Sequence, residues 1–296
     1  MIYPSFARRL SRHYPPELVA EDPPPSSGRR GSRPPRRRRR TMQGKSDRFV
    51  WGPDRDGRQV PASQLQMESM MAQVDEDAPK YLAPTPFIDC DSQEIIEYAH
   101  SVAWRNGSAV DNAISLYNAV RDDVRYDPYN VRLDLAHLKA SYTLQVRRGF
   151  CVSKAVLLAA VSRAVGIPSR LGFADVRNHL TTAHLKMIMG TDLFVYHGYT
   201  ELFLNDRWVK ATPAFNRSLC ERFNVKPLAF DGVNDSVFQP YDAQGNRYLE
   251  YIRDHGAYAD VPLGDIVESF KRHYPRLVVE SVLVNEGDFE HEAQPL

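Results

Sequence analysis

The pattern of apolar and polar positions predicts helices in the middle of the chain and strands after them. A helix is expected from Asp91 or Ser92, where a capping residue precedes a first-turn carboxylate and apolar residues at helical spacing. A second helix is expected over residues 111–120, whose apolar positions recur on one face. A longer apolar helix opens at Cys151 and stops at Gly166-Ile-Pro168, because glycine followed by proline ends a helix.

A hairpin is the clearest β element of the sequence. Its strands cover residues 194–204 and 207–212, and they meet at Asn205-Asp206, two residue types that tolerate the positive φ of a tight turn. The turn fixes the register: Phe203 faces Trp208, Glu201 faces Lys210, Tyr199 faces Thr212 and His197 faces Ala214. Period two then predicts one shared sheet face for His197, Tyr199, Glu201, Phe203, Trp208, Lys210 and Thr212.

Helices followed by a sheet predict an α+β fold. Short strands are also expected over residues 170–173 and 186–189, and helices near 248–254 and over 263–274. The expected domain plan has four parts: a disordered Pro/Arg-rich tail over 1–48, a poorly structured linker over 49–86, a catalytic domain with helical additions over 87–284, and an acidic flexible tail over 285–296.

Charge is divided unevenly along the chain. Residues 1–41 contain eleven Arg, no Lys, eight Pro and three acidic residues, a net charge of +8 against −7 for the remainder. Such a segment buries too little apolar surface to offset its ordering entropy, so we expect it to be disordered. Three interpretations stay open: a tail that contacts nucleic acid or another anionic surface, a passive solvated tail, or a working start at Met42. The acidic remainder argues against a nucleic-acid groove in the folded part.

Composition indicates a cytoplasmic protein. The longest apolar runs, such as residues 155–161, are far shorter than the ~20 residues of a membrane helix. Three cysteines in 296 residues are too few for a disulfide scaffold and favour a reducing compartment. The first thirty residues contain no apolar core of a secretory signal. The oligomeric state is left open.

Cys151 is the candidate nucleophile. It follows Gly149-Phe150 at the expected start of a helix, where the helix dipole and unpaired N–H groups lower a thiol pKa and favour the thiolate. A buried structural cysteine is the alternative. Cys90 and Cys220 lack this setting and are expected to be structural or incidental.

His197 is the candidate base. In the expected register Thr212 is its diagonal neighbour across the hairpin, so its hydroxyl could hold the imidazole tautomer. A structural histidine on a strand is the alternative. The Glu201–Lys210 pair is interpreted as a cross-strand ion pair.

The remaining polar candidates do not indicate a cofactor or a metal. Asp175, His179 and His184 match no strong ligand spacing and are expected to line a cleft or contact substrate, as is Tyr199. No calcium loop, phosphate loop or dinucleotide motif occurs.

Taken together, three segments resemble the transglutaminase-like superfamily of papain-like cysteine acyltransferases and proteases, in a bacterial type of domain. Residues 149–170, from Gly-Phe-Cys to Gly-Ile-Pro-Ser-Arg, are similar to its nucleophile helix. The hairpin from His197 to Thr212 resembles its His strand and the Trp strand that follows, and residues 120–126 resemble the helix and Tyr that open its core.

The resemblance implies a papain-like α+β fold with the nucleophile helix packed on an antiparallel sheet. It also implies acyl transfer through a thioester on a protein or peptide amide, without a cofactor. Cys151 would be the nucleophile and His197 the base and acid, and family members use this chemistry for transamidation, deamidation or peptide hydrolysis.

The sequence departs from the family at the third catalytic residue. The usual Asp, four positions after the Trp and before a Pro, is replaced by Thr212 before Pro213. Threonine can accept the imidazole N–H but brings no negative charge, and Asn216 is a substitute candidate. This departure motivates the alternative hypothesis of an inactive or weakly active scaffold or binding module.

Two donors could stabilise an oxyanion. Gln145 lies six residues before Cys151, at the spacing of the oxyanion glutamine in papain-type proteases, although a surface side chain is the alternative. The backbone N–H of Cys151 at the helix start needs no side chain.

Overall fold

The computed structural model describes residues 51–53, 59–61, 78–179, 181–238, 249–274, 282–284 and 287–294. The chain divides into two units, residues 1–49 and 50–296, and all described residues belong to the second. The predicted disordered tail over 1–48 lies outside the described residues, as does most of the predicted linker over 49–86.

A four-stranded antiparallel sheet carries the fold, in the order β8-β7-β6-β9. Its strands are β6 (Ser169–Asn178), β7 (Leu193–Leu204), β8 (Arg207–Ala211) and β9 (Leu249–Tyr258). Short pairs complete the β structure: β1 (Trp51–Pro53) with β2 (Gln59–Pro61), β3 (Arg125–Tyr126) with β5 (Arg148–Gly149), and β4 (Asn130–Arg132) with β10 (Val282–Val284).

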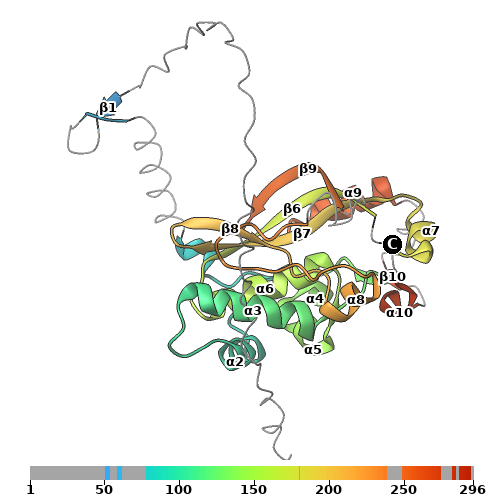
Figure 1. Ribbon diagram of the computed structural model, residues 1–296, viewed down its shortest axis with the longest axis horizontal. Helices are drawn as coiled ribbons and strands as arrows, with labels where there is room; N and C mark the ends of the chain where they lie inside the picture. Colours follow the sequence, from blue (N-terminus) through green and yellow to red (C-terminus); the bar gives the residue numbers. More distant parts are fainter. Residues whose placement is uncertain are drawn as a thin grey trace, which may run out of the picture. The chain divides into compact units, whose positions relative to one another are not determined.

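Helices cover the sheet, as Figure 1 shows for α2, α3, α5 and α6 on one face. Those before the sheet are η1 (Ala78–Tyr81), α2 (Gln93–Val102), α3 (Ala109–Asp123), α4 (Leu135–Leu138), α5 (Ala140–Val146) and α6 (Cys151–Ala164). The later ones are α7 (Ala183–Met189), α8 (Arg217–Arg222), α9 (Leu263–His273) and α10 (Phe289–Glu292).

Helix α6 lies at the centre of the core. Its first thirteen residues are all buried, and it contacts α2, α3 and α5 on one side and β7 on the other. Even Lys154 is inaccessible, and its ammonium donates hydrogen bonds to the carbonyl oxygens of Arg121 (2.9 Å) and Val124 (2.5 Å) at the end of α3. Because burial disfavours its charged form, the pKa of Lys154 falls to about 7. The buried lysine therefore caps α3 and ties it to α6.

The predicted hairpin is present. Asn205 and Asp206 both have positive φ, 49° and 60°, and Phe203 pairs with Trp208 and Glu201 with Lys210. The predicted ion pair between Glu201 and Lys210 is wrong. Glu201 pairs instead with Arg170 at 2.6 Å, while Lys210 bonds the Tyr199 hydroxyl at 3.1 Å and lies 3.5 Å from Asp254.

Two predicted elements have the wrong type. Residues 186–189, predicted as a strand, belong to helix α7, which Thr182 caps by accepting from Leu185 N and which ends at left-handed Gly190. Residues 248–254, predicted as a helix, mostly belong to strand β9, because they pair with β6.

Two segments outside the predicted catalytic domain pack on the core. In residues 78–86, the Tyr81 ring lies 5.0 Å from the Trp208 ring. In residues 287–294, Phe289 is buried, Glu290 pairs with Arg125 at 3.1 Å, and Glu292 accepts from the Tyr129 hydroxyl at 2.5 Å. Within the described part of the chain, no helix has the length and apolar character to cross a membrane.

Candidate active site

Cys151 occupies the first position of α6, as predicted. Phe150 precedes it in an extended conformation and gives the helix no side-chain cap, so the first N–H groups of α6 are not taken by a capping side chain. The thiol is free and the residue is buried, with 8% of its surface exposed.

Gly198 brings β7 against this helix start. A Cβ at Gly198 would lie 2.9 Å from Val152 Cα, closer than real Cβ atoms approach backbone. Glycine is therefore required at this crossing. Thr200, two residues on, donates to the Ala155 carbonyl at 2.8 Å and extends the contact along α6.

His197 precedes Gly198 and shares a pocket with Cys151. It pairs with Ala174 of β6, and its ring stands edge-on to Phe238 with centroids 6.4 Å apart. The imidazole is buried, and its Nε2 has no hydrogen-bond partner among the described residues. Both side chains line one cavity with the following residues: Tyr126, Pro128, Val131, Phe150, Leu185, Ile188, Met189, Phe194, Val195, Tyr196, Phe270 and Tyr274.

Burial sets the protonation states of the two residues. It raises the pKa of the Cys151 thiol to about 11, although the N–H groups of Gly198, Val152 and Cys151 lower it by hydrogen bonding to the sulfur. It lowers the pKa of His197 to about 4. At neutral pH these shifts favour a thiol and a neutral imidazole, because desolvation by the core outweighs the helix start, which favours a thiolate.

Thr212 lies one residue beyond the end of β8. Its hydroxyl is buried and has no partner among the described residues, so it makes no hydrogen bond to His197 in this structure. Its backbone carbonyl accepts from the Tyr117 hydroxyl at 3.1 Å.

Asn216 is engaged elsewhere. Its Oδ1 accepts from the Tyr126 N–H at 3.0 Å, and its Nδ2 donates to Ser218 Oγ at 2.7 Å. The structure therefore does not bring its amide to His197. Instead Asn216 holds the backbone of Tyr126, whose ring lines the cavity.

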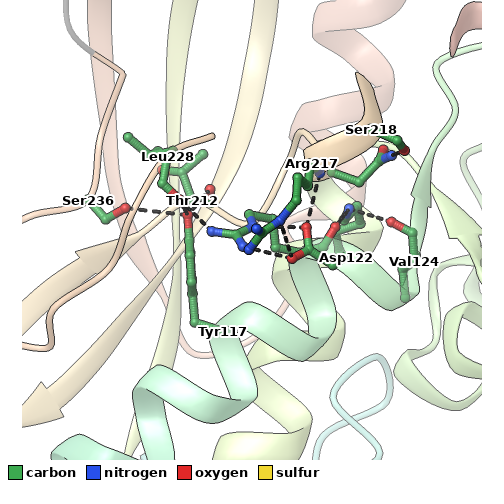
Figure 2. Close-up of polar contacts among 11 residues, drawn as sticks. Tyr117, Asp122, Val124, Thr212, Arg217, Ser218, Leu228 and Ser236 are labelled. Carbon is green, nitrogen blue, oxygen red and sulfur yellow. Dashed lines mark hydrogen bonds and ion pairs between the residues drawn. The ribbon is translucent and has the colours of Figure 1, made fainter. Parts of the chain in front are cut away.

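A polar network anchors the segment that carries Thr212 and Asn216 (Figure 2). The Tyr117 hydroxyl also donates to the Leu228 carbonyl at 3.0 Å, and Ser236 Oγ donates to Tyr117 at 3.4 Å. Asp122 accepts from the Arg217 N–H at 3.0 Å. These bonds tie the segment to the end of α3.

Gln145 lies away from the thiol. It is exposed on α5 and lines a separate surface depression with Tyr98 and Tyr142. The prediction of an oxyanion glutamine is therefore not supported by its position. The backbone N–H groups at the thiol come from α6 and, at Gly198, from β7.

Asp175 lies behind the cavity rather than in it. Its Oδ1 accepts from the Tyr196 N–H at 3.0 Å and lies 2.7 Å from His255 Nε2. Tyr196 adopts a left-handed φ of 53°, which is rare for an aromatic residue, and lies opposite the irregularity of β6 between Ala174 and Val176.

Tyr199 lines a different depression. Its neighbours there include Lys210 and Asp254, and its ring covers Gly172 of β6. It is therefore not a residue of the cavity at Cys151.

The three polar residues considered for a metal have separate partners. Asp175 pairs with His255, His179 with Glu250 at 3.2 Å, and His184 with Glu292 at 3.2 Å. In the described ranges, no three His, Cys, Asp or Glu side chains could hold a metal ion together.

Residues 96–213 match the family model of the transglutaminase-like superfamily, so the chain carries a transglutaminase-like domain over this range. The predicted resemblance and the predicted α+β fold, with the Cys151 helix on an antiparallel sheet, are confirmed. A search of curated proteins found no match.

Solved structures with some similarity include a candidate cysteine protease from Cytophaga hutchinsonii, with 16% identity, coverage of 62% of this chain and 54% of that one, and a TM-score of 0.38. A candidate protease from Parabacteroides distasonis has 13% identity, covers 49% and 26%, and has a TM-score of 0.30. The arylamine N-acetyltransferase from Mycobacterium abscessus has 15% identity, covers 46% and 47%, and has a TM-score of 0.31. The chain spans about half or less of the length of these structures.

Proposed function

We propose that the protein transfers the acyl group of an amide substrate through a thioester on Cys151, with His197 as base and acid. One observation carries the proposal: a cysteine at the start of a buried helix shares a cavity with an imidazole whose Nε2 is buried and unpartnered. A buried polar atom without a partner is costly, and such atoms occur where function requires them. The family match supports a cysteine-based enzymatic role.

The proposed reaction starts from the neutral pair. The imidazole takes the thiol proton as sulfur bonds to the carbonyl carbon and the carbonyl electrons move to oxygen. The C–N bond then breaks, and the imidazolium returns its proton to the departing amine. Water or an amine attacks the thioester, and the imidazole takes the proton of this nucleophile. The carbonyl then re-forms as the C–S bond breaks, and the imidazolium gives the proton to sulfur, which regenerates the thiol and the neutral imidazole.

Backbone groups are proposed to stabilise the oxyanion. The N–H groups of Cys151, Val152 and Gly198 act to lower the pKa of the thiol, which supports them as the groups nearest to a carbonyl carbon that bonds to the sulfur. This assignment replaces Gln145.

Thr212 is proposed as the group that orients His197 during the reaction. The support is that Thr212 Oγ1 and His197 Nε2 are both buried and both lack partners among the described residues. In this arrangement Nε2 meets Thr212, and the other ring nitrogen, Nδ1, is the one that takes the thiol proton. Asn216 is the weaker candidate, because its amide already bonds Tyr126 and Ser218.

We further propose a protein or peptide amide as substrate and the cytoplasm as the location. All three cysteines are free and buried, as expected in a reducing compartment.

The test is to trap the thioester. The protein is incubated with activated acyl esters, and the mass of the intact chain and the site of acylation are measured. Cys151 should gain the acyl group and lose it to hydroxylamine, Cys151→Ala should gain none there, and His197→Ala should be acylated at least a hundredfold more slowly. Folded His197→Ala protein with an unchanged rate would contradict the role of the imidazole.

A non-catalytic binding module is the second candidate. Two observations favour it: none of the described residues brings a carboxylate to His197, whose pKa is lowered by burial alone, and burial raises the pKa of Cys151. Failure of every ester to acylate Cys151 in the folded protein would favour this alternative.

A further inference from the structure

We infer that the cavity beside Cys151 binds a short, uncharged apolar group on the acyl side of the substrate. The inference rests on the proposed function of Cys151. It adds the chemical class of the group that the site accepts.

The chemistry of the cavity wall carries the inference. Apart from Cys151, His197 and three tyrosines, the described side chains that line the cavity are aliphatic, aromatic, proline or methionine, and none of them is charged. Among the tyrosines, Tyr274 has its hydroxyl hydrogen-bonded to the backbone of β7: the hydroxyl accepts from the Val195 N–H at 2.7 Å and donates to the Leu193 carbonyl at 2.9 Å. A charged group of the substrate would be desolvated here without a partner, whereas an apolar group gains from leaving water.

Size limits the group to a few carbon atoms. The cavity volume is about 50 Å³, and one water needs about 10–15 Å³ on the same measure. A short aliphatic group is therefore of the right scale, and a long chain is not.

A second, polar depression lies beside the apolar cavity and indicates where the departing amine binds. Residues of the short strand β4 line the two in turn: Val131 lines the apolar cavity, whereas Asn130 and Arg132 line the polar depression. This depression has a volume of about 360 Å³ and is also lined by Asp127 and Arg148. Phe150, next to the nucleophile, lines both. The retained acyl group fits the apolar side, and the departing amine, which needs hydration, fits the polar side.

Helix α7 sets the limit of the cavity. Leu185, Ile188 and Met189 line it from this helix, and Met189 is 8% exposed. Met187 lies on the same helix but is 69% exposed and does not line the cavity. The two methionines form a matched pair for substitution.

The experiment measures the second-order rate of Cys151 acylation by acetyl, butyryl, hexanoyl and octanoyl 4-nitrophenyl esters. The rate should rise up to about fourfold per added methylene until the cavity is filled, and then fall. Met189→Trp should move the optimum to a shorter chain and Met189→Ala to a longer one. Met187→Trp should leave it unchanged. Circular dichroism checks that each variant is folded. If Met189→Trp does not fold, the shift of the optimum in Met189→Ala alone tests the role of Met189.

Binding without chemistry separates the two proposals. Hexanamide should raise the Tm of Cys151→Ala, and succinamate, its charged counterpart, should not. Acylation that does not depend on chain length overturns the apolar pocket but leaves the nucleophile intact. If Cys151 is not acylated by any ester but hexanamide still raises the Tm, and Met189→Trp abolishes this rise, the proposed function is overturned while the apolar pocket is supported.

Discussion

His255 lies stacked on Tyr196, with ring centroids 4.0 Å apart and planes 17° from parallel. The histidine comes from β9 and the tyrosine from β7, and Asp175 of the strand between them bonds both residues. Tyr196 is held in a left-handed conformation next to His197. The three residues therefore fix the backbone from which the candidate base projects.

We predict that Asp175→Ala releases this backbone. The Tyr196 N–H would lose its acceptor, and the left-handed φ would lose its main support, so the free energy of unfolding should fall by about 1–3 kcal/mol. The rate of Cys151 acylation at saturating ester should fall about tenfold or more, with little change in half-saturation. Asp175→Asn, which retains an acceptor oxygen, should recover part of the rate.

Asp192→Ala is the control for Asp175. Asp192 accepts a hydrogen bond from the side chain of Arg177 on β6 at 3.3 Å, but the Asp192 side chain is 45% exposed, so its loss should cost less than about 1 kcal/mol. Equal effects of the two alanine substitutions would show that Asp175 does not position Tyr196.

Gly198→Ala should separate β7 from the start of α6. Its Cβ would meet Val152 Cα at 2.9 Å, so the strand or the helix must move, at a cost of about 1–3 kcal/mol, and His197 would move with the strand. Urea unfolding and the acylation rate measure the two effects. Gly264→Ala is the matched control, because its Cβ would meet nothing within 4 Å, and it should leave both quantities nearly unchanged.

The resting thiol should react slowly at neutral pH. Because burial raises the pKa of Cys151 to about 11, alkylation by iodoacetamide should climb across the alkaline range without a plateau near pH 7. Peptide mass spectrometry after timed alkylation gives the profile. A plateau below pH 8 that disappears in His197→Ala would reveal a thiolate–imidazolium pair instead.

His197 should make the protein less stable in acid. Its pKa falls from 6.5 to about 4 on folding, so between these values the unfolded chain binds more protons than the folded one. The stability that the neutral imidazole retains above pH 6.5 is lost as the pH falls toward 4, by up to about 3 kcal/mol. The free energy of unfolding, measured by denaturant titration between pH 7 and pH 4, should therefore fall more steeply with decreasing pH for the wild type than for His197→Gln. Identical slopes would contradict the buried neutral state.

Local signals in the sequence were sufficient for the elements that position Cys151 and His197. The start of α6 follows from an apolar run after Gly149, and the hairpin register follows from the turn at Asn205-Asp206. Both depend on residues close together in the chain, so spacing alone predicts them.

The errors arose where distant residues decide the structure. Strand β9 is largely exposed and has no clean alternation, so pairing with β6, not its own pattern, makes it a strand. Residues 186–189 form a short apolar run that by itself indicates a strand, but Thr182 before the segment and Gly190 after it are the cap and stop signals of a helix.

The site was harder to predict than the fold. Gly198 offered a signal, because glycine inside a strand often marks a close backbone approach. The pairing of Asp175 with His255, 80 residues later, offered none. The protonation state of Cys151 depends on burial by the whole core, which motif spacing does not report.

The packing of residues 287–294 also has a consequence for synthesis on the ribosome. Glu292 accepts from the hydroxyl of Tyr129, 163 positions earlier, and Phe289 packs 5.5 Å from the ring of Tyr126, which lines the cavity. The thiol and the imidazole are both translated long before these contacts exist. Phe289 does not itself line the cavity but packs on a residue that does, so we expect Tyr126 to gain this support only after translation has passed Phe289.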